Sequence, residues 1–141
     1  MKPIYGFLAL VAVILPLHAM AQQGNIARAQ FTSGILDREP VDNVTSLDNQ
    51  TERVMFFTEL RNMENKTIVH RWELNGEVMA AITFNVRGPR WRVHSSKELL
   101  PEWTGKWVVT VLDENGAELG SYTLNYGPNG MSSPSGSTTT N

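Results

Sequence analysis

Residues 87–107 bring arginine, lysine and tryptophan close together in the sequence, and the chemistry of these side chains suits the binding of an anion. Arg90 and Arg92 flank Trp91 in a segment with strand character, so the two guanidinium groups are expected to share one face. A guanidinium donates paired hydrogen bonds to carboxylate, phosphate or sulfate and also stacks on aromatic rings. Trp103 would add an apolar contact to a sugar or lipid. The predicted ligand-binding residues are Arg71, Arg90, Arg92, Lys97 and Trp103.

The same residue types also have a purely structural explanation. Trp72, Trp91 and Trp107 lie where a β-sandwich needs large core side chains, and tryptophan is highly buried on average. His70 shares a strand face with Trp72, and we expect it to be a hydrogen-bonded core residue rather than a base or a ligand. For the arginines both explanations stay open, because they could instead pair with acidic residues of the chain.

An enzymatic interpretation needs carboxylates and histidines that meet in one cleft. Glu59 or Glu73, with His70 or His94, could hydrolyse a glycan if the acidic groups lay at the separation that glycosidases use. The sequence contains none of the common nucleotide-binding, serine hydrolase or zinc protease motifs, and no pattern typical of a metal site. We therefore predict no catalytic residue, no metal and no cofactor.

Seven segments of strand character, separated by turn signals, predict an all-β protein. They are residues 26–36, 53–60, 67–74, 78–87, 90–95, 106–113 and 117–126. Asn75-Gly76 is typical of a two-residue hairpin between the third and fourth segments. Short strands at this spacing favour an antiparallel β-sandwich of immunoglobulin-like type with about seven strands, and a small barrel is the alternative.

Three further segments carry predictions of their own. Ser95 and Glu98 have the spacing of a capping box, which predicts a helical turn over residues 95–100. Residues 37–52 have a net charge of −4 and are expected to form a long connection. Residues 117–126 could be an edge strand to which a partner protein docks.

The N-terminal residues have the pattern of a secretory signal peptide. Lys2 precedes an apolar run at residues 4–17, and Ala19-Met20-Ala21 fits a cleavage site before Gln22. An exported protein of this kind is expected to be periplasmic, or secreted, with no membrane span in its mature chain. The predicted organisation is a signal peptide at 1–21, a single β-sandwich domain at 22–126 and a disordered tail at 127–141.

The net charge and the absence of cysteine exclude some classes of partner and of chemistry. The 141 residues have a net charge of −2, which becomes −3 without Lys2. A nucleic-acid binder would show a basic excess, so we predict no nucleic-acid partner. Cysteine is absent, which excludes thiol catalysis and means that the apolar core must hold the fold without disulfides.

Five short motifs resemble a bacterial family in type and order. They are Arg38-Glu39-Pro40, Phe56-Phe57-Thr58-Glu59-Leu60, His70-Arg71-Trp72, Arg90-Trp91-Arg92 with Ser95-Ser96, and Gly105-Lys106-Trp107-Val108-Val109. Over roughly residues 26–126 the chain thereby resembles the domain of unknown function 2914, found in bacterial envelope-associated proteins. The resemblance implies a single compact all-β domain. It implies no particular reaction, so it assigns no catalytic residue.

Together these observations predict an exported envelope protein that acts as a non-catalytic binding or interaction module. Its expected partner is an envelope glycan, an anionic lipid head group or another protein. Two alternatives remain open at this point, a hydrolase acting on envelope glycans and a structural accessory subunit that docks by an edge strand.

Overall fold

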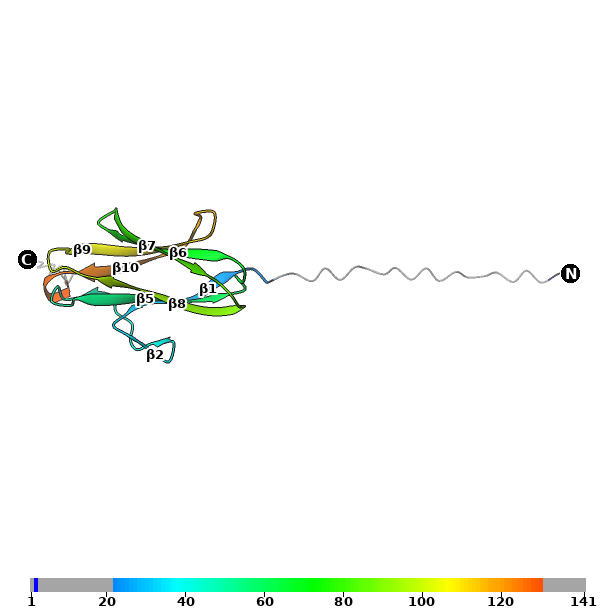
Figure 1. The fold of residues 1–141 in the computed structure, drawn as a ribbon, viewed down its shortest axis with the longest axis horizontal. Helices are drawn as coiled ribbons and strands as arrows, with labels where there is room; N and C mark the ends of the chain where they lie inside the picture. Colours follow the sequence, from blue (N-terminus) through cyan, green and yellow to red (C-terminus); the bar gives the residue numbers. More distant parts are fainter. Residues whose placement is uncertain (1, 3–21, 131–141) are drawn as a thin grey trace, which may run out of the picture.

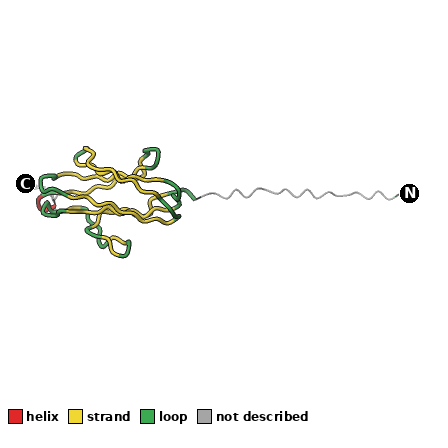
Figure 2. The backbone as a smooth tube through the Cα atoms, in the orientation of Figure 1, coloured by secondary structure: helices red, strands yellow, loops and turns green. Residues whose placement is uncertain are grey.

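The computed structural model describes Lys2 and residues 22–130, and residues 22–130 form two β-sheets packed face to face (Figure 1). The rest of the predicted signal peptide and residues 131–141 of the predicted tail lie outside the described residues. Strands run the length of both layers and loops gather at the ends, as Figure 2 shows. The one helical element described is a short 3₁₀ turn, η1 (Pro128–Gly130).

The two sheets differ in size. The smaller has the antiparallel order β1 (Asn25–Thr32), β5 (Arg53–Arg61) and β8 (Arg90–Glu98). The larger has the order β4 (Ser46–Leu47), β10 (Glu118–Tyr126), β9 (Gly105–Leu112), β6 (Thr67–Leu74) and β7 (Glu77–Asn85). Only the pairing of β4 with β10 is parallel. A separate hairpin joins β2 (Ile35–Leu36) to β3 (Glu39–Pro40). The predicted all-β, antiparallel sandwich is confirmed.

The structure has ten strands rather than about seven, and the three additional ones lie between residues 35 and 47. The first predicted strand continues to residue 36, whereas β1 ends at Thr32 because the chain turns there into the hairpin. Asp42 fixes this turn, since its carboxylate accepts hydrogen bonds from the Ser33 backbone N–H (2.7 Å) and hydroxyl (2.5 Å). The additional strands have two residues each, too few to produce an alternating pattern.

The predicted helical turn over residues 95–100 is wrong. Ser95 and Glu98 belong to β8, where they pair with Phe56 and Arg53 of β5. Instead of capping a helix, the Ser95 hydroxyl accepts a hydrogen bond from the indole N–H of Trp72 at 3.0 Å. Tertiary pairing therefore overrides a local capping signal.

The core lies between the sheets and follows the period of two. Trp107, Val109 and Val111 alternate along β9 and are fully buried. Trp72 on β6 is also fully buried, and its ring meets that of Trp107 edge-on at 6.4 Å between centroids. Asn75 and Gly76 have the positive φ angles, 50° and 87°, that the expected two-residue hairpin requires.

A buried polar network crosses the core from one sheet to the other. His70 of β6 lies 3.0 Å from the Thr58 hydroxyl and 2.8 Å from the Ser95 hydroxyl, both on the smaller sheet. Trp72 donates its N–H to Ser95, so Ser95 can donate to Nδ1 of His70, and Nε2–H then donates to Thr58. Burial, with a smaller contribution from His94, lowers the pKa of His70 to about 3. His70 is therefore a neutral core residue.

The two ends of the described domain lie at opposite ends of the sandwich (Figure 1). The chain enters β1 at one end, and η1 follows β10 at the other. Asn129 of η1 donates its N–H to the Asp48 carboxylate at 3.0 Å, and Gly127 donates its N–H to the Leu47 carbonyl at 3.1 Å. The larger sheet thus continues into a short ordered segment after β10.

Candidate functional site

The β2–β3 hairpin, residues 33–42, projects from the outer side of the smaller sheet (Figure 1). Glu39 connects the two, because its carboxylate pairs with Arg28 of β1 at 2.8 Å and with Arg92 of β8. Phe57 points to this outer face yet is only 1% exposed, since the guanidinium of Arg28 lies 5.1 Å from its ring centroid. The outer face therefore has a second, small layer of its own.

Glu59 is the centre of an ion-pair network on this outer face. Its side chain is 3% exposed and lies 2.6 Å from Arg28, 2.6 Å from Arg61 and 3.1 Å from Arg90. The hydrogen bonds from Arg90 and then Arg28 outweigh burial and lower the pKa of Glu59 to about 2. Glu59 therefore remains an anion and holds three arginines from three strands together.

We call these arginines, together with Arg92, the arginine face: Arg28, Arg61, Arg90 and Arg92. Glu39 is the second carboxylate among them, and hydrogen bonds from Arg28 and then Arg92 lower its pKa to about 2. With Asp37 and Arg38 from the hairpin tip, this surface has five arginines and three carboxylates, a net charge of +2. The whole chain has a net charge of −2, so the arginine face concentrates charge of the opposite sign.

A cavity of about 500 Å³ lies between the tip of the β2–β3 hairpin and β8, and we call it the β8 cavity. Its lining consists of Ile35, Asp37, Arg38, Phe57, Arg90, Trp91, Arg92, Val93 and His94. Four of these are apolar and four carry basic groups, against one carboxylate. Such a lining suits a ligand that joins an anionic group to an apolar one.

Arg38 reaches the β8 cavity from a strained backbone. Asp37 and Arg38 form the two-residue turn of the hairpin with φ angles of 50° and 65°. Asparagine and glycine usually occupy such turns, as at Asn75-Gly76, and a left-handed conformation costs an arginine roughly 1 kcal/mol. Strain of this kind concentrates at functional positions. An arginine at position 38 costs stability, so we infer that it is there for function rather than for folding.

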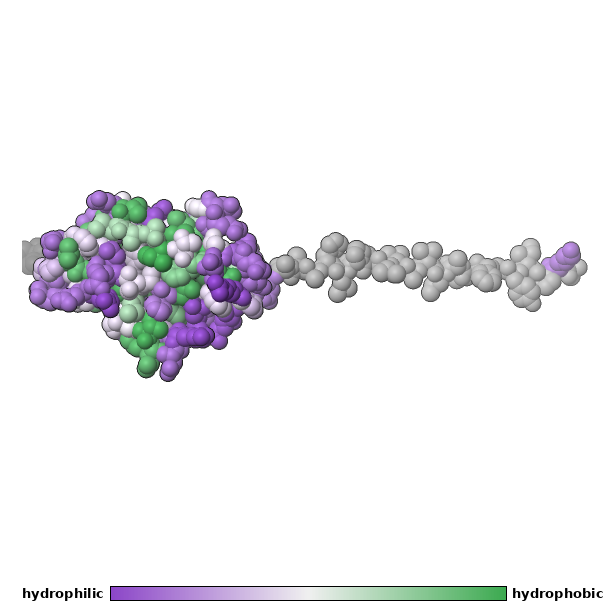
Figure 3. Space-filling model, in the orientation of Figure 1, coloured by the Kyte–Doolittle hydropathy of each residue, from purple (hydrophilic) through white to green (hydrophobic). Residues whose placement is uncertain are grey.

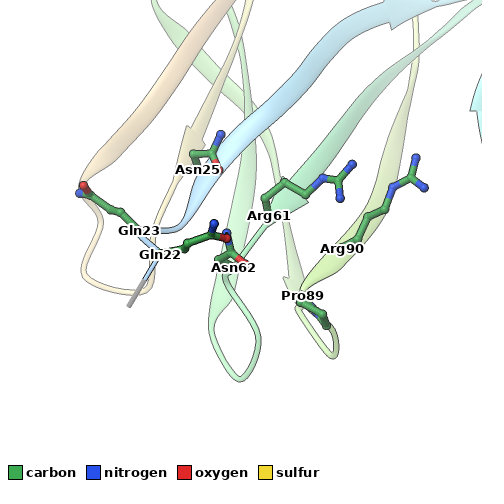
Figure 4. A pocket seen from close by; sticks show the side chains of 7 residues that line it. All are labelled: Gln22, Gln23, Asn25, Arg61, Asn62, Pro89 and Arg90. Atoms are coloured by element: carbon green, nitrogen blue, oxygen red, sulfur yellow. The ribbon is translucent and has the colours of Figure 1, made fainter. Parts of the chain in front are cut away.

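A second, open hollow of about 590 Å³ adjoins the first and shares Arg90 with it. Figure 4 shows Arg61 and Arg90 extending in the same direction from neighbouring strands, with Gln22 beside Asn62. The Asn62 amide donates a hydrogen bond to the Gln22 side chain at 3.2 Å. The amides and guanidinium groups extend the polar, basic surface to the end of the sheet.

The structure divides the predicted binding residues among three places. Arg90 and Arg92 lie together in the β8 cavity. Lys97 and Trp103 also meet, at 4.9 Å between the ammonium and the ring centroid, but Lys97 points to the inner side of β8. Arg71 lies on the larger sheet, 2.7 Å from Glu73, and its Nε makes no hydrogen bond there. The β8 cavity therefore contains two of the five residues.

The groups of the hydrolase alternative lie in different environments. His70 is in the core and Glu73 lies on the larger sheet, whereas Glu59 is enclosed by arginines on the smaller sheet and His94 lines the β8 cavity. Across residues 22–130, no three His, Cys, Asp or Glu side chains are grouped as a metal site would require. Among the helices of the described part of the chain, none is long and apolar enough to cross a membrane.

Sequence reasoning missed Arg28, Arg38 and Arg61 as members of this surface. Arg28 and Arg61 join it through the register of β1 and β5, which pairs Arg28 with Glu59 and Arg61 with Arg90. No pattern within one segment reveals such a register. Arg38 had no clear local signal either, because Asp37-Arg38 is followed by Glu39 rather than by an apolar residue.

Comparison with known families supports the resemblance found from the motifs. Residues 65–125 match the model of a family described as protein of unknown function (DUF2914). The matched residues contain β6 to β9 and nearly all of β10, whereas the hairpin and Glu59 precede them. No curated protein matches the chain.

Proposed function

We propose that this chain, whose residues 65–125 belong to the DUF2914 family, is an exported, non-catalytic module that binds an anionic component of the cell envelope. The β8 cavity is the proposed binding site. The observation that carries the proposal is the excess of basic groups around a partly apolar cavity in a chain that is acidic overall. Export is proposed from the signal-peptide pattern of residues 1–21.

The arginines of the β8 cavity keep donors free for a ligand. Arg90 is half exposed although it pairs with Glu59, and Arg92 is one quarter exposed beside Glu39. Each guanidinium has five N–H donors, more than one carboxylate uses. Arg38 adds a guanidinium at the hairpin tip. A carboxylate, phosphate or sulfate in the cavity would therefore find paired donors on more than one side.

Binding is a better explanation of this surface than hydrolysis. A glycosidase needs one carboxyl group that donates a proton near neutral pH. The carboxyl group of Glu59 does the opposite, because its arginine partners lower its pKa to about 2. A permanently ionised Glu59 suits a structural role, in which it spaces the arginines that would contact a ligand.

Replacing Arg38 with glycine is expected to weaken anion binding and to stabilise the protein at the same time. Glycine adopts the φ of 65° at position 38 without the steric cost that arginine has there, a gain of about 1 kcal/mol or less in the free energy of unfolding. Loss of the guanidinium should reduce affinity for acidic sugars or phosphorylated head groups about tenfold. A thermal-shift titration of the purified protein with peptidoglycan fragments, acidic sugars and lipid head groups measures both effects.

Arg71→Ala is the matched control, since Arg71 is on the other sheet and lies beside Glu73. It should leave the ligand-induced shift unchanged. The proposal fails if no anion in the panel raises the melting temperature, or if Arg38→Gly binds as tightly as the wild type. Equal loss in Arg38→Gly and Arg71→Ala would contradict the choice of the β8 cavity.

A further inference from the structure

We infer that the free edge of β8 in this cavity binds an extended acidic segment of a partner protein, which pairs with β8 as an additional strand. The inference rests on the proposed function and names the class of ligand for the same site. It depends on which backbone groups β8 leaves unpaired, on the side chains beside them and on the surface next to the cavity.

The hydrogen bonds at both ends of the β5–β8 ladder fix its pattern. Asn62 donates its N–H to the Pro89 carbonyl at 2.8 Å, and Leu99 donates its N–H to the Glu52 carbonyl at 2.9 Å. Hydrogen-bonded pairs alternate with non-bonded pairs in an antiparallel ladder, so the odd-numbered residues of β8 bond to β5. Arg90, Arg92 and the other even-numbered residues therefore direct their N–H and C=O groups away from β5.

No neighbouring strand takes up these outward-directed backbone groups. β8 is the last strand of its sheet, and among residues 22–130 no backbone hydrogen bond joins it to a segment other than the one containing β5. Residues 90–94 all line the β8 cavity, although alternate side chains point to opposite faces. A cavity that touches both sets of residues lies along the open edge of the strand. Arg92 and His94 thus offer free backbone donors and acceptors inside it.

The side chains on the two faces of β8 specify the pattern of the added strand. On the outer face stand Arg90, Arg92 and His94, and on the inner face stand the half-buried Trp91 and Val93. A paired strand places its side chains beside those of its neighbour on each face. The complementary segment therefore alternates acidic and apolar residues, with its carboxylates on the arginine face.

The charges also explain which strands would be rejected. An exposed edge is a general pairing site, and proteins protect such edges with charged side chains. The arginines of β8 repel a basic segment and attract an acidic one. A purely apolar segment would leave the charges of these arginines unpaired, so it is also disfavoured. The free edge of β7 is different, because residues 78–84 carry no charged side chain.

An apolar surface beside the cavity favours a protein over a small anion. Leu36 and Val41 of the β2–β3 hairpin are 67% and 54% exposed. Figure 3 shows apolar surface on the protrusion that Figure 1 identifies as the hairpin. A small anion would leave these side chains in water, while a protein that supplies the added strand can cover them.

The test measures amide hydrogen exchange of the isotope-labelled protein by NMR with a blocked peptide, Glu-Val-Glu-Val-Glu-Val-Glu. The expected result is at least tenfold slower exchange of the Arg92 and His94 amides, because both become bonded to the peptide. A peptide of the same composition in two blocks, Glu-Glu-Glu-Glu-Val-Val-Val, should not slow these amides. Citrate serves as the anion without a backbone and should shift the signals of the arginine side chains only.

The outcomes separate the two proposals. If citrate shifts the Arg90 and Arg92 signals but the alternating peptide leaves the amides unprotected, the strand inference is overturned and anion binding stands. If neither has any effect, both are overturned. Equal protection by the two peptides would also overturn the inference, since it would show that alternation has no role.

A pair of variants at one position tests the backbone contact separately. His94→Pro removes a backbone N–H that points into the cavity. Because this N–H makes no hydrogen bond to β5, proline is tolerated at this position of an edge strand. His94→Ala removes the same imidazole but keeps the N–H. We expect His94→Pro to bind the alternating peptide at least tenfold more weakly than His94→Ala, and equal affinities would contradict strand pairing. The exchange experiment on the wild type decides the question if His94→Pro does not fold.

Discussion

Glu59→Gln is expected to destabilise the protein by about 2 kcal/mol and, at the same time, to strengthen its binding of anions. The side chain of Glu59 is 3% exposed and faces Arg28, Arg61 and Arg90 at 2.6 to 3.1 Å. A neutral amide of the same size leaves three guanidinium groups without their shared counterion. Their repulsion lowers the free energy of unfolding, and the unpaired donors become available to a ligand in the β8 cavity.

Thermal unfolding and ligand titration of the same preparation measure both effects. A loss of about 2 kcal/mol lowers the melting temperature by on the order of 10 °C in a domain of this size. Glu98→Gln is the matched control, because Glu98 pairs with Arg53 in an exposed site where both side chains are more than half exposed. That variant should change stability by about 0.5 kcal/mol or less. A stable Glu59→Gln protein, or one with weaker anion binding, would contradict the role given to Glu59.

Acidification from pH 6.5 to pH 4.5 is expected to reduce the free energy of unfolding by about 2 to 3 kcal/mol, through His70. The pKa of His70 is about 3 in the folded protein, below its ordinary value of 6.5. Between these values the unfolded chain binds a proton that the folded protein does not. The stabilisation due to neutral His70 is therefore complete above pH 6.5 and is lost as the pH falls toward 3.

Two carboxyl groups extend this loss to lower pH. The pKa values of Glu39 and Glu59 are lowered to about 2, so their contribution is present above their ordinary value of 4.5 and disappears as the pH falls toward 2. Between pH 6.5 and 4.5 the histidine therefore causes most of the loss, because Glu39 and Glu59 begin to bind protons in the unfolded chain only near the lower limit of this interval.

Chemical denaturation at a series of pH values, for the wild type and two histidine variants, measures the effect. His70→Gln should be less stable than the wild type at pH 7, since it loses a fitted partner for Thr58 and Ser95, but its stability should fall much less than that of the wild type between pH 6.5 and 4.5. His94→Gln changes an exposed histidine and should keep the slope. A His70→Gln protein with the slope of the wild type would show that His70 is not the titrating group.

Alternation along single segments was enough to predict the sandwich, and it failed where strands are short. The buried series Trp107, Val109 and Val111 and the Asn75-Gly76 turn are visible in sequence because each depends on neighbours only. The β2–β3 hairpin depends on the Asp42 carboxylate, which holds both ends of a ten-residue excursion. A contact of that kind produces no alternation of apolar and polar residues in the sequence.

The candidate site was predictable only in part, for related reasons. The period of two correctly places Arg90 and Arg92 on one face. Lys97 comes five positions after Arg92, and an odd offset places it on the opposite face of a continuous strand, but the mistaken helical turn at 95–100 concealed this. Arg71 belongs to the other sheet, and only the strand order determines that. The partners of Glu59 follow from register, which one sequence does not specify.

The chain enters β1 at one end of the sandwich and leaves β10 at the other, and this arrangement determines how the domain would respond to tension (Figure 1). A pull on the two ends runs along β1 and β10 rather than across them. The hydrogen bonds of their ladders are perpendicular to the strands, so the force acts on them as shear and many must break together. A partner held at the edge of β8 is on neither strand that is pulled. Tension along the long axis of the sandwich would therefore not act directly on the proposed binding edge.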